Sequence, residues 1–245
     1  MPSHQRRDGD QRGGWRAVRA MCSAFPSFTS AYRQRRLREY TAEVMQRRHL
    51  VIFTRYPRMG AGKRRLAADI GPVEALRFQR VSLANTLRRL ASDKRWTTWL
   101  AVTPDRSGPW PPACRIIPQG QGDLGQRLTR LIDRLPLGPV LIVGSDAPNI
   151  TRSLVSRAFH HLQGHDAVIG PAMDGGYWAI GLRRRPREVA PFHSVRWSTS
   201  HALDDTLKNL DGRSVIRLPR LDDVDDATSL ARCPYWSVLH GPHYT

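Results

Sequence analysis

The chain has 245 residues, enough to bury one substantial hydrophobic core or two small ones. Its formal net charge is +18; residues 1–48 hold 11 Arg against 4 acidic residues, and the rest of the chain holds 28 basic and 17 acidic residues. This basic character favours anionic ligands such as nucleotides, sugar phosphates or nucleic acid. The arginines are scattered, and neither zinc-finger spacing nor an RNA-binding signature is present, which argues against nucleic acid.

Cysteine usage and hydropathy bear on the compartment. Cys22, Cys114 and Cys233 are far apart and form no CxxC pair. This argues against a disulfide framework or a zinc site and is typical of a reducing compartment, so we expect a cytoplasmic protein. The longest apolar run, VLIVG, is far shorter than the roughly 18 residues that a membrane span needs.

The first 44 residues differ from the rest of the chain. They are rich in Arg, show no steady periodicity and have no clean apolar segment before a small-residue cleavage site. They fit a transit-like peptide, a disordered basic arm or an overextended gene start. We favour an overextended start at Met45, because the first predicted strand begins soon after it. We expect a single domain over residues 45–235 and a C-terminal tail at 236–245.

Predicted strands and helices alternate from His49 onward. Apolar runs rich in Val, Ile and Trp predict strands at 49–54, 96–103, 114–118, 139–145, 166–172, 176–182 and 214–219. Apolar spacing near 3.6 residues, together with cap and stop signals, predicts helices at 72–92, 124–135, 149–163 and 199–210. The alternation predicts a three-layer α/β fold with a mainly parallel sheet, and the Gly-Gly pair at 175–176 suggests a late antiparallel element.

The first predicted strand leads into a basic turn, which reads FTRYPRMGAGKRRL at residues 53–66. A P-loop is excluded, because Lys63 is followed by Arg64 and the position five before Gly62 is Pro57. The glycines would let the backbone approach a ligand, and the Arg and Lys side chains match phosphate oxygens. The segment is therefore either a phosphate site or a solvated basic turn.

Polar segments follow the predicted strands at the points where the strands end. Besides the basic turn, these segments are QGQGDLGQR (119–127), GSDAPN (144–149), PAMDGGYW (171–178) and DDVDD (222–226). Ligands in open α/β sheets lie beyond the carboxyl ends of the strands. We therefore expect these segments to share one edge of the sheet and to form one site.

One of these segments contains a dinucleotide-binding fingerprint. Gly120, Gly122 and Gly125 spell G-x-G-x-x-G, and Asp146 lies at the end of the next strand. Three features weaken an NAD interpretation: the motif follows the third strand rather than the first, a proline precedes it, and Pro148 forces a turn close to the acidic residue. NAD binding stays a secondary alternative.

The acidic residues suggest a metal site instead. Asp146, at a strand end, and Asp223 and Asp225, which alternate along an extended segment, offer oxygen ligands suited to Mg²⁺ or Mn²⁺. A metal there would bridge the phosphates of a nucleotide, and Lys63 and the arginines would neutralise the leaving group. Each acid also has a purely structural interpretation, as a helix cap, a solvated turn or, for Asp174, a turn residue before glycine.

Six motifs in order resemble those of a known family. They are FTRYPRMGAGKRRLA, QGQGDLGQR, GSDAP, GPAMDGGYWAIGL, the segment 192–199 and LPRLDDVDD. Over residues 49–230 the chain resembles the DUF2064 family, also labelled "transferase 1, radical-SAM/selenodomain-associated", with members described as arsenosugar-biosynthesis glycosyltransferases. That family is similar to glycosyltransferase-A nucleotide-diphospho-sugar transferases, and more distantly to nucleotidyltransferases such as 2-phospholactate guanylyltransferase.

The resemblance implies a Rossmann-like glycosyltransferase-A fold with the nucleotide over its N-terminal half and a small acceptor over its C-terminal half. The implied phosphate and nucleotide contacts are Arg55, Gly60, Lys63, Arg65, Gly122 and Asp123. The implied metal ligands for Mg²⁺ or Mn²⁺ are Asp146 and Asp225, and the acidic pattern adds Asp223. The implied acceptor side is the stretch from Asp174 to Tyr177, which includes Gly175 and Gly176, and we add Trp197 to it. Our candidate catalytic residues are Asp146 and Asp174.

The chain departs from the family pattern at several positions. Arg64 stands where Thr is usual, Asp226 also replaces Thr, and Ser229 replaces an acid, so position 229 offers no carboxylate. We expect a metal-dependent transferase that moves a sugar from a nucleotide sugar to a small acceptor, with Asp174 orienting or deprotonating the acceptor. The alternatives are a nucleotidyltransferase that releases pyrophosphate from a nucleoside triphosphate and a nucleotide-binding module without turnover.

Overall fold

The helices and strands follow one another much as the apolar patterns predict. The computed structural model describes residues 47–112, 114–184 and 190–233. The strands are β1 (His49–Arg55), β2 (Thr97–Thr103), β3 (Arg115–Pro118), β4 (Val140–Gly144), β5 (Ala167–Pro171), β6 (Tyr177–Leu182) and β7 (Val215–Arg217). The helices are α3 (Arg64–Ile70), α4 (Pro72–Leu90), α5 (Leu124–Arg134), α6 (Arg152–His161), α7 (Ala202–Asn209) and α8 (Ala227–Ala231). The predicted arm at 1–44, Cys22 and the predicted tail at 236–245 lie outside the described residues.

The strands form one mixed sheet in the order β3-β2-β1-β4-β6-β5-β7. β1 pairs in parallel with β2 and β4, and β2 pairs in parallel with β3. β6 is antiparallel to both β4 and β5, and β7 is parallel to β5. The predicted mainly parallel sheet with a late antiparallel element is confirmed. After β3 the chain returns to the other side of β1, and ligands in open α/β sheets bind beyond the carboxyl ends of strands at such a reversal.

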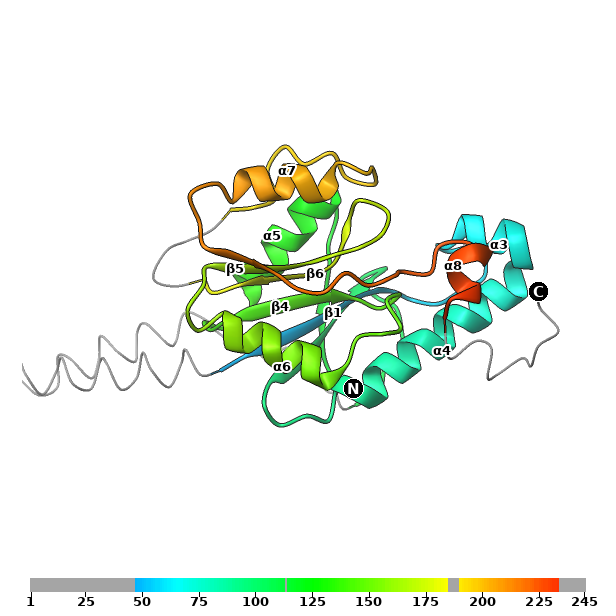
Figure 1. The fold of residues 1–245 in the computed structure, drawn as a ribbon. Helices are drawn as coiled ribbons and strands as arrows, with labels where there is room; N and C mark the ends of the chain where they lie inside the picture. Colours follow the sequence, from blue (N-terminus) through cyan, green and yellow to red (C-terminus); the bar gives the residue numbers. More distant parts are fainter. Residues whose placement is uncertain (1–46, 113, 185–189, 234–245) are drawn as a thin grey trace, which may run out of the picture. The chain divides into compact units, whose positions relative to one another are not determined.

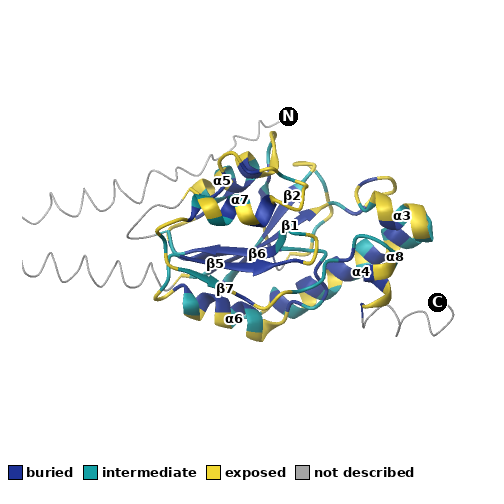
Figure 2. Cartoon of the chain, turned by 45° about the horizontal axis from the view of Figure 1, so that its top comes forward, coloured by how far each residue is buried: buried dark blue, intermediate teal, exposed yellow. Residues whose placement is uncertain are grey.

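Helices cover both faces of the sheet and complete the three predicted layers (Figure 1). α4 and α6 pack on one face, and α5 and α7 pack on the other. Leu50 and Ile52 of β1 belong to the first of these cores and Val51 to the second, because successive side chains of a strand point to opposite faces. Figure 2 shows the buried strands between helices whose outer faces are exposed.

A third, smaller apolar cluster joins α3, α4 and α8. Leu66 of α3, Phe78 of α4 and Leu230 of α8 pack there with Val224, which lies just before α8. The cluster therefore holds the basic turn that precedes α3 close to the acidic segment 222–226 that precedes α8. The helix predicted at 72–92 corresponds to α4, whereas neither α3 nor α8 was among the predicted helices.

Within the described ranges, no helix combines the length and the apolar character that crossing a bilayer requires. Cys114 and Cys233 are free and buried. Burial raises the pKa of the Cys114 thiol, so this side chain stays protonated and packs as a small apolar group.

Candidate functional site

A cavity of about 420 Å³ opens at the carboxyl ends of β1 and β4, where the strand order reverses. Its lining includes Thr54, Lys63, Gln119, Arg127, Asp146 and Tyr177, which come from segments far apart in the sequence. The volume lies in the range typical of small-molecule sites. The cavity is therefore in the place where the topology predicts a ligand.

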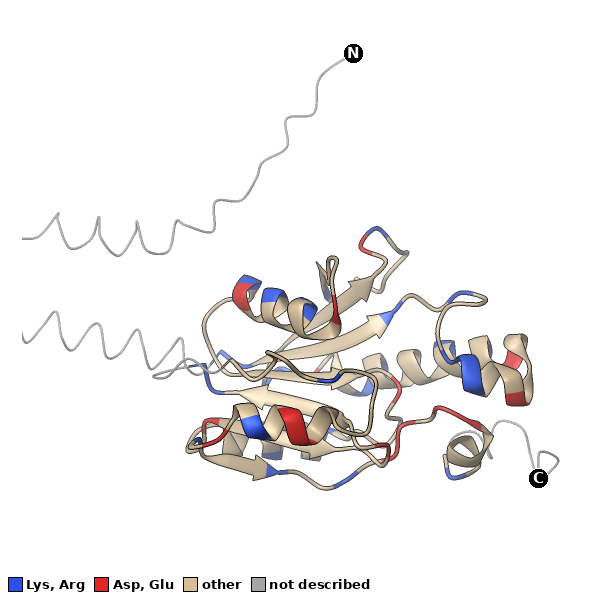
Figure 3. Ribbon diagram, turned by 90° about the horizontal axis from the view of Figure 1, so that it is seen from above, with Lys and Arg blue, Asp and Glu red and all other residues tan. Residues whose placement is uncertain are grey.

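The basic turn forms one rim of this cavity. Gly60 and Gly62 have φ angles of 72° and 84°, which glycine adopts without steric cost. A second hollow lies against the same turn, lined by Arg55, Arg58, Met59, Gly60, Ala61, Gly62 and Arg64. Arg65, a predicted phosphate contact, is exposed on α3 and lines neither hollow. Figure 3 shows basic residues along this turn, facing an acidic stretch on the coil that leads to α8.

Lys63 points away from solvent and joins two carboxylates. Its Nζ donates to Asp146 Oδ2 at 2.8 Å and to Asp225 Oδ1 at 2.6 Å. Its side chain is 9% exposed, whereas the two carboxylates are 43% and 42% exposed. Burial disfavours the charged form, but the two carboxylates outweigh it and raise the pKa of Lys63 above its usual range. Lys63 is therefore an ammonium ion held between two anions.

Asp146 follows β4 and lies beside the acidic segment. The amide of Val224 donates to the Asp146 carbonyl at 3.3 Å, which ties the segment 222–226 to the end of β4. Burial would raise the pKa of the Asp146 carboxyl, but the adjacent Lys63 ammonium holds that pKa below its ordinary value. Asp146 is thus ionised and paired with Lys63.

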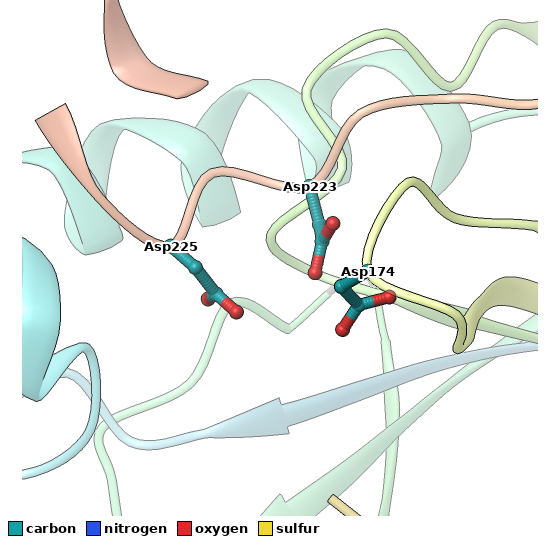
Figure 4. Close-up of side chains that lie close together, drawn as sticks. All are labelled: Asp174, Asp223 and Asp225. Carbon is teal, nitrogen blue, oxygen red and sulfur yellow. The ribbon is translucent and has the colours of Figure 1, made fainter. Parts of the chain in front are cut away.

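Three carboxylates gather next to this ion pair (Figure 4). Asp174, Asp223 and Asp225 each present an oxygen within 4.8 Å of the other two. Val224 is buried in the apolar cluster, so its two neighbours lie on the opposite side of the extended segment. Asp174 comes from the turn between β5 and β6, where its Oδ1 accepts from the Gly176 amide at 2.8 Å.

The charges of this carboxylate cluster act on one another. Burial and then the neighbouring Asp174, Asp225 and Asp146 raise the pKa of Asp223 to about 6. Without a cation, ionising Asp223 therefore costs folding free energy. The carboxylate cluster and the ion pair with Lys63 together place all four predicted acids at one edge of the sheet. Asp146 accepts a hydrogen bond from Lys63, and Asp174 is the third member of the cluster.

The raised pKa of Asp223 predicts how the metal-free protein responds to pH. Because the folded state holds the proton more tightly than the unfolded state, stability falls as pH rises through about 6. The variant Asp223→Asn should match the wild type near pH 4.5 and be more stable by about 1–3 kcal/mol at pH 8. Thermal unfolding in EDTA across this range measures the difference, and a difference that does not change with pH would contradict the assignment.

Asp226 and Ser229 depart from the family pattern, and the structure gives both a local role. Asp226 caps α8 by accepting from the Ser229 amide at 2.7 Å, and the Ser229 hydroxyl accepts from the Asp226 amide at 3.1 Å. This is a reciprocal capping box, which satisfies backbone donors at the start of a helix. Ser229 also accepts from the Asp225 amide at 2.9 Å, so the cap helps to fix Asp225. The missing carboxylate at Ser229 thus leaves the cluster intact.

The glycine-rich segment before α5 is built around another capping box. Asp123 accepts from the Gln126 amide at 2.8 Å, and Gln126 Oε1 accepts from the Asp123 amide at 3.2 Å. Gly122 has a φ of 100°, and a Cβ there would lie 2.1 Å from Gln126 Oε1. Both Gly122 and Asp123 are exposed, and the cavity is lined instead by Leu124 and Arg127.

Gln119, which the sequence analysis did not single out, lies at the cavity. Its side chain is buried, and Nε2 donates to the carbonyls of Thr54 and Ala101, each at 2.9 Å. Its Oε1 has no hydrogen-bond partner within the part of the chain that the structure describes. A buried, unpaired acceptor is costly. In the sequence, Gln119 is marked as a candidate site residue only by its position directly after a strand.

Gly125, the third glycine of the fingerprint, provides a close contact between α5 and the segment 192–197. A Cβ at Gly125 would lie 2.6 Å from the Phe192 carbonyl and 2.9 Å from Trp197 Nε1. Gly125→Ala should therefore cost about 1–3 kcal/mol through overpacking, and it should lower the melting temperature by several degrees. Gly164→Ala is the matched control, because nothing lies within 4 Å of its added Cβ. Equal melting temperatures for the two variants would show that the segment can move away.

The predicted acceptor side carries aromatic residues. Tyr177 lines the cavity, and its ring lies 6.4 Å from that of Trp197, which packs in turn on Phe192. Burial raises the pKa of Tyr177, so its hydroxyl stays neutral. Gly175 makes backbone contacts with Ser200, so its role in the fold is packing.

Residues 86–199 match the DUF2064 family. The family is described as "Uncharacterized protein conserved in bacteria (DUF2064)", and this match agrees with the resemblance seen in the motifs. No protein of curated function matches the chain significantly.

Solved structures share the fold. A "putative nucleotide-diphospho-sugar transferase" from Desulfovibrio desulfuricans G20 is 26% identical, with a TM-score of 0.71 over 80% of this chain and 89% of its own. A 4-diphosphocytidyl-2C-methyl-D-erythritol synthase from Anaerococcus prevotii is 11% identical, with a TM-score of 0.51 over 79% of this chain and 98% of its own. The sheet and its layers are thus those of nucleotide-sugar transferases and nucleotidyltransferases.

Proposed function

We propose that this chain is a divalent-metal-dependent transferase that uses a nucleotide sugar as donor and a small molecule as acceptor. The observation that carries the proposal is one cavity at the carboxyl edge of the sheet with a basic turn on one rim and three converging carboxylates beside it. A diphosphate needs both the positive charge and the oxygen-bound cation. The 26% identical "putative nucleotide-diphospho-sugar transferase" supports this choice of donor.

The residues present suit Mg²⁺ or Mn²⁺. Carboxylate oxygens are the ligands that these hard cations prefer, and Asp174, Asp223 and Asp225 lie within 4.8 Å of one another. Burial and then repulsion from neighbouring carboxylates raise the pKa of Asp223, and a cation shared among the three relieves the repulsion. When bound, the metal would supply charge that stabilises the departing diphosphate.

The chain's own residues supply the remaining functions. Arg55 and Lys63 would neutralise the phosphates, and the left-handed glycines of the basic turn let the backbone approach them. Tyr177, with Trp197 packed behind it, would form an apolar wall for the acceptor. Asp174 was predicted to orient or deprotonate the acceptor; its place in the cluster favours a role as metal ligand at the boundary between donor and acceptor.

A thermal-unfolding panel tests the proposal. The protein is heated with Mn²⁺ or with EDTA in the presence of nucleotide sugars, nucleoside triphosphates, nucleoside diphosphates or NAD. A ligand at about 100 times its dissociation constant should stabilise the fold by roughly 2.7 kcal/mol. We expect a shift of about 5–10 °C with one nucleotide sugar, lost in EDTA.

The other outcomes of the panel point elsewhere. A shift with a triphosphate alone would indicate nucleotidyl transfer, in which pyrophosphate leaves. A shift with NAD that EDTA does not change would overturn the assignment of the whole site. Binding of a nucleotide sugar without release of nucleoside diphosphate, tested over a panel of acceptors, would favour a binding module.

A further inference from the structure

The ammonium of Lys63 binds one member of the carboxylate cluster. It lies 2.8 Å from Asp146 Oδ2 and 2.6 Å from Asp225 Oδ1. Asp225 is at the same time one of the three carboxylates of the cluster. A side chain of the protein itself therefore competes with a divalent cation for Asp225.

The backbone of Lys63 shows that this arrangement is held in place by its surroundings. Lys63 has φ 46° and ψ 44°, in the left-handed region that residues with a side chain rarely adopt. It is the N-cap residue of α3, yet its side chain makes no cap hydrogen bond there. Such conformations persist only where other contacts impose them. The two ion pairs are the side-chain contacts of Lys63 that offset the cost of this backbone conformation.

The cavity offers Lys63 a second set of anionic partners. Lys63 lines the cavity together with Arg55 and Gly62, so a diphosphate bound there would lie within reach of the same ammonium. A lysine ammonium is a compact charge on a flexible stem and can change partners by rotation of its side chain. When Lys63 turns to a phosphate, Asp225 is left free to complete the three-carboxylate cluster.

We propose that Lys63 couples nucleotide binding to metal binding. Without a nucleotide, its ammonium blocks Asp225 and keeps the affinity for the cation low. A bound diphosphate draws Lys63 away, and the cation then binds at full strength. This inference rests on the proposed function, because it takes the cavity as a diphosphate site and the cluster as a metal site.

The coupling has a thermodynamic consequence. If a diphosphate raises the affinity of the protein for the cation, the cation must raise the affinity for the diphosphate by the same factor. The protein would therefore take up the two together. A free cation would seldom be held in a cavity without substrate, and a nucleotide without metal would be held only by the basic residues.

The first experiment measures Mn²⁺ binding to the full chain without nucleotide, by electron paramagnetic resonance of the free ion. Lys63→Met removes the competing charge and should bind Mn²⁺ roughly tenfold more tightly than the wild type. Lys94→Met is the matched control: it is the same substitution at an exposed residue between α4 and β2, at the opposite edge of the sheet. It should leave the Mn²⁺ affinity unchanged.

The second experiment measures the other half of the coupling, with inorganic pyrophosphate in EDTA by calorimetry. Lys63→Met should bind pyrophosphate roughly tenfold more weakly than the wild type, and Lys94→Met should equal the wild type. Lys63→Gln, which keeps a donor without the charge, replaces Lys63→Met in both experiments if the Met variant does not fold.

The outcomes separate the inference from the proposed function. Equal Mn²⁺ affinities in the wild type and the Lys63 variant would overturn the inference and leave the metal site standing. Tighter Mn²⁺ binding with unchanged pyrophosphate binding would also overturn the coupling. Failure of both proteins to bind Mn²⁺ would remove the metal site, and with it the proposed function.

Discussion

Replacing Asp225 with Asn should reduce transferase activity by at least about 10³-fold, or roughly 4 kcal/mol of transition-state stabilisation. Asp225 is the one residue that belongs to both the carboxylate cluster and the ion pair with Lys63. An amide in its place offers a weaker, neutral ligand and leaves Lys63 paired with Asp146 alone. We therefore expect Mn²⁺-dependent thermal stabilisation by the nucleotide sugar to disappear along with activity.

Asp222→Asn provides the matched control for this experiment. Asp222 lies in the same acidic segment and makes an exposed ion pair with Arg232 at 3.0 Å, outside the carboxylate cluster. The same change of charge there should leave Mn²⁺ binding and turnover within about twofold of the wild type. If both variants lost activity equally, the segment would act through its overall charge, and no individual carboxylate would be a ligand.

Most of the fold could be predicted from the sequence because its strands are buried on both faces. Such strands appear as short, uninterrupted apolar runs between turn residues, and the structure places β1, β4 and β6 within a residue or two of the predicted bounds. α8 was missed because its five residues carry no periodic pattern. It is stabilised by the capping box of Asp226 and Ser229 and by contacts with α3 and α4.

The candidate site could be predicted only in part. The rule that ligands bind beyond the carboxyl ends of strands correctly brought Asp146, Asp174, Asp223 and Asp225 to one edge. The rule cannot say which of these acids touch, because that depends on loop conformations with no period in the sequence. The pairing of Asp146 with Lys63 is a contact of this kind.

One predicted nucleotide contact, Asp123, has a local role in the fold, and one cavity residue was not predicted. Asp123 was predicted to line the nucleotide, but it caps α5 and is exposed. A Gly-Asp pair before a helix fits a cap as well as a phosphate loop. Gln119 lies at the cavity because β3 ends beside β2, and no local pattern marks it.

Gly175→Ala should destabilise the fold by about 3–4 kcal/mol. Gly175 has a φ of 84°, and an added Cβ would lie 2.3 Å from the Ser200 carbonyl oxygen and 2.6 Å from the Ser200 Cα. These are backbone atoms, so no side-chain rotation can relieve the clash. The Gly175 carbonyl also accepts from the Leu203 amide at 3.0 Å, which links the turn that carries Asp174 to α7.

Gly212→Ala separates the two causes of this effect. Gly212 has a φ of 69°, but nothing lies within 4 Å of an added Cβ. Its variant should therefore lose only about 1 kcal/mol of stability, which is the cost of the backbone conformation alone. Denaturant unfolding of both variants should leave a difference of about 2–3 kcal/mol that is due to the contact with Ser200. If the two variants lost equal stability, the turn could move away from Ser200. In that case Gly175 would be required only for its conformation, and its place beside Asp174 could again be assigned to the acceptor.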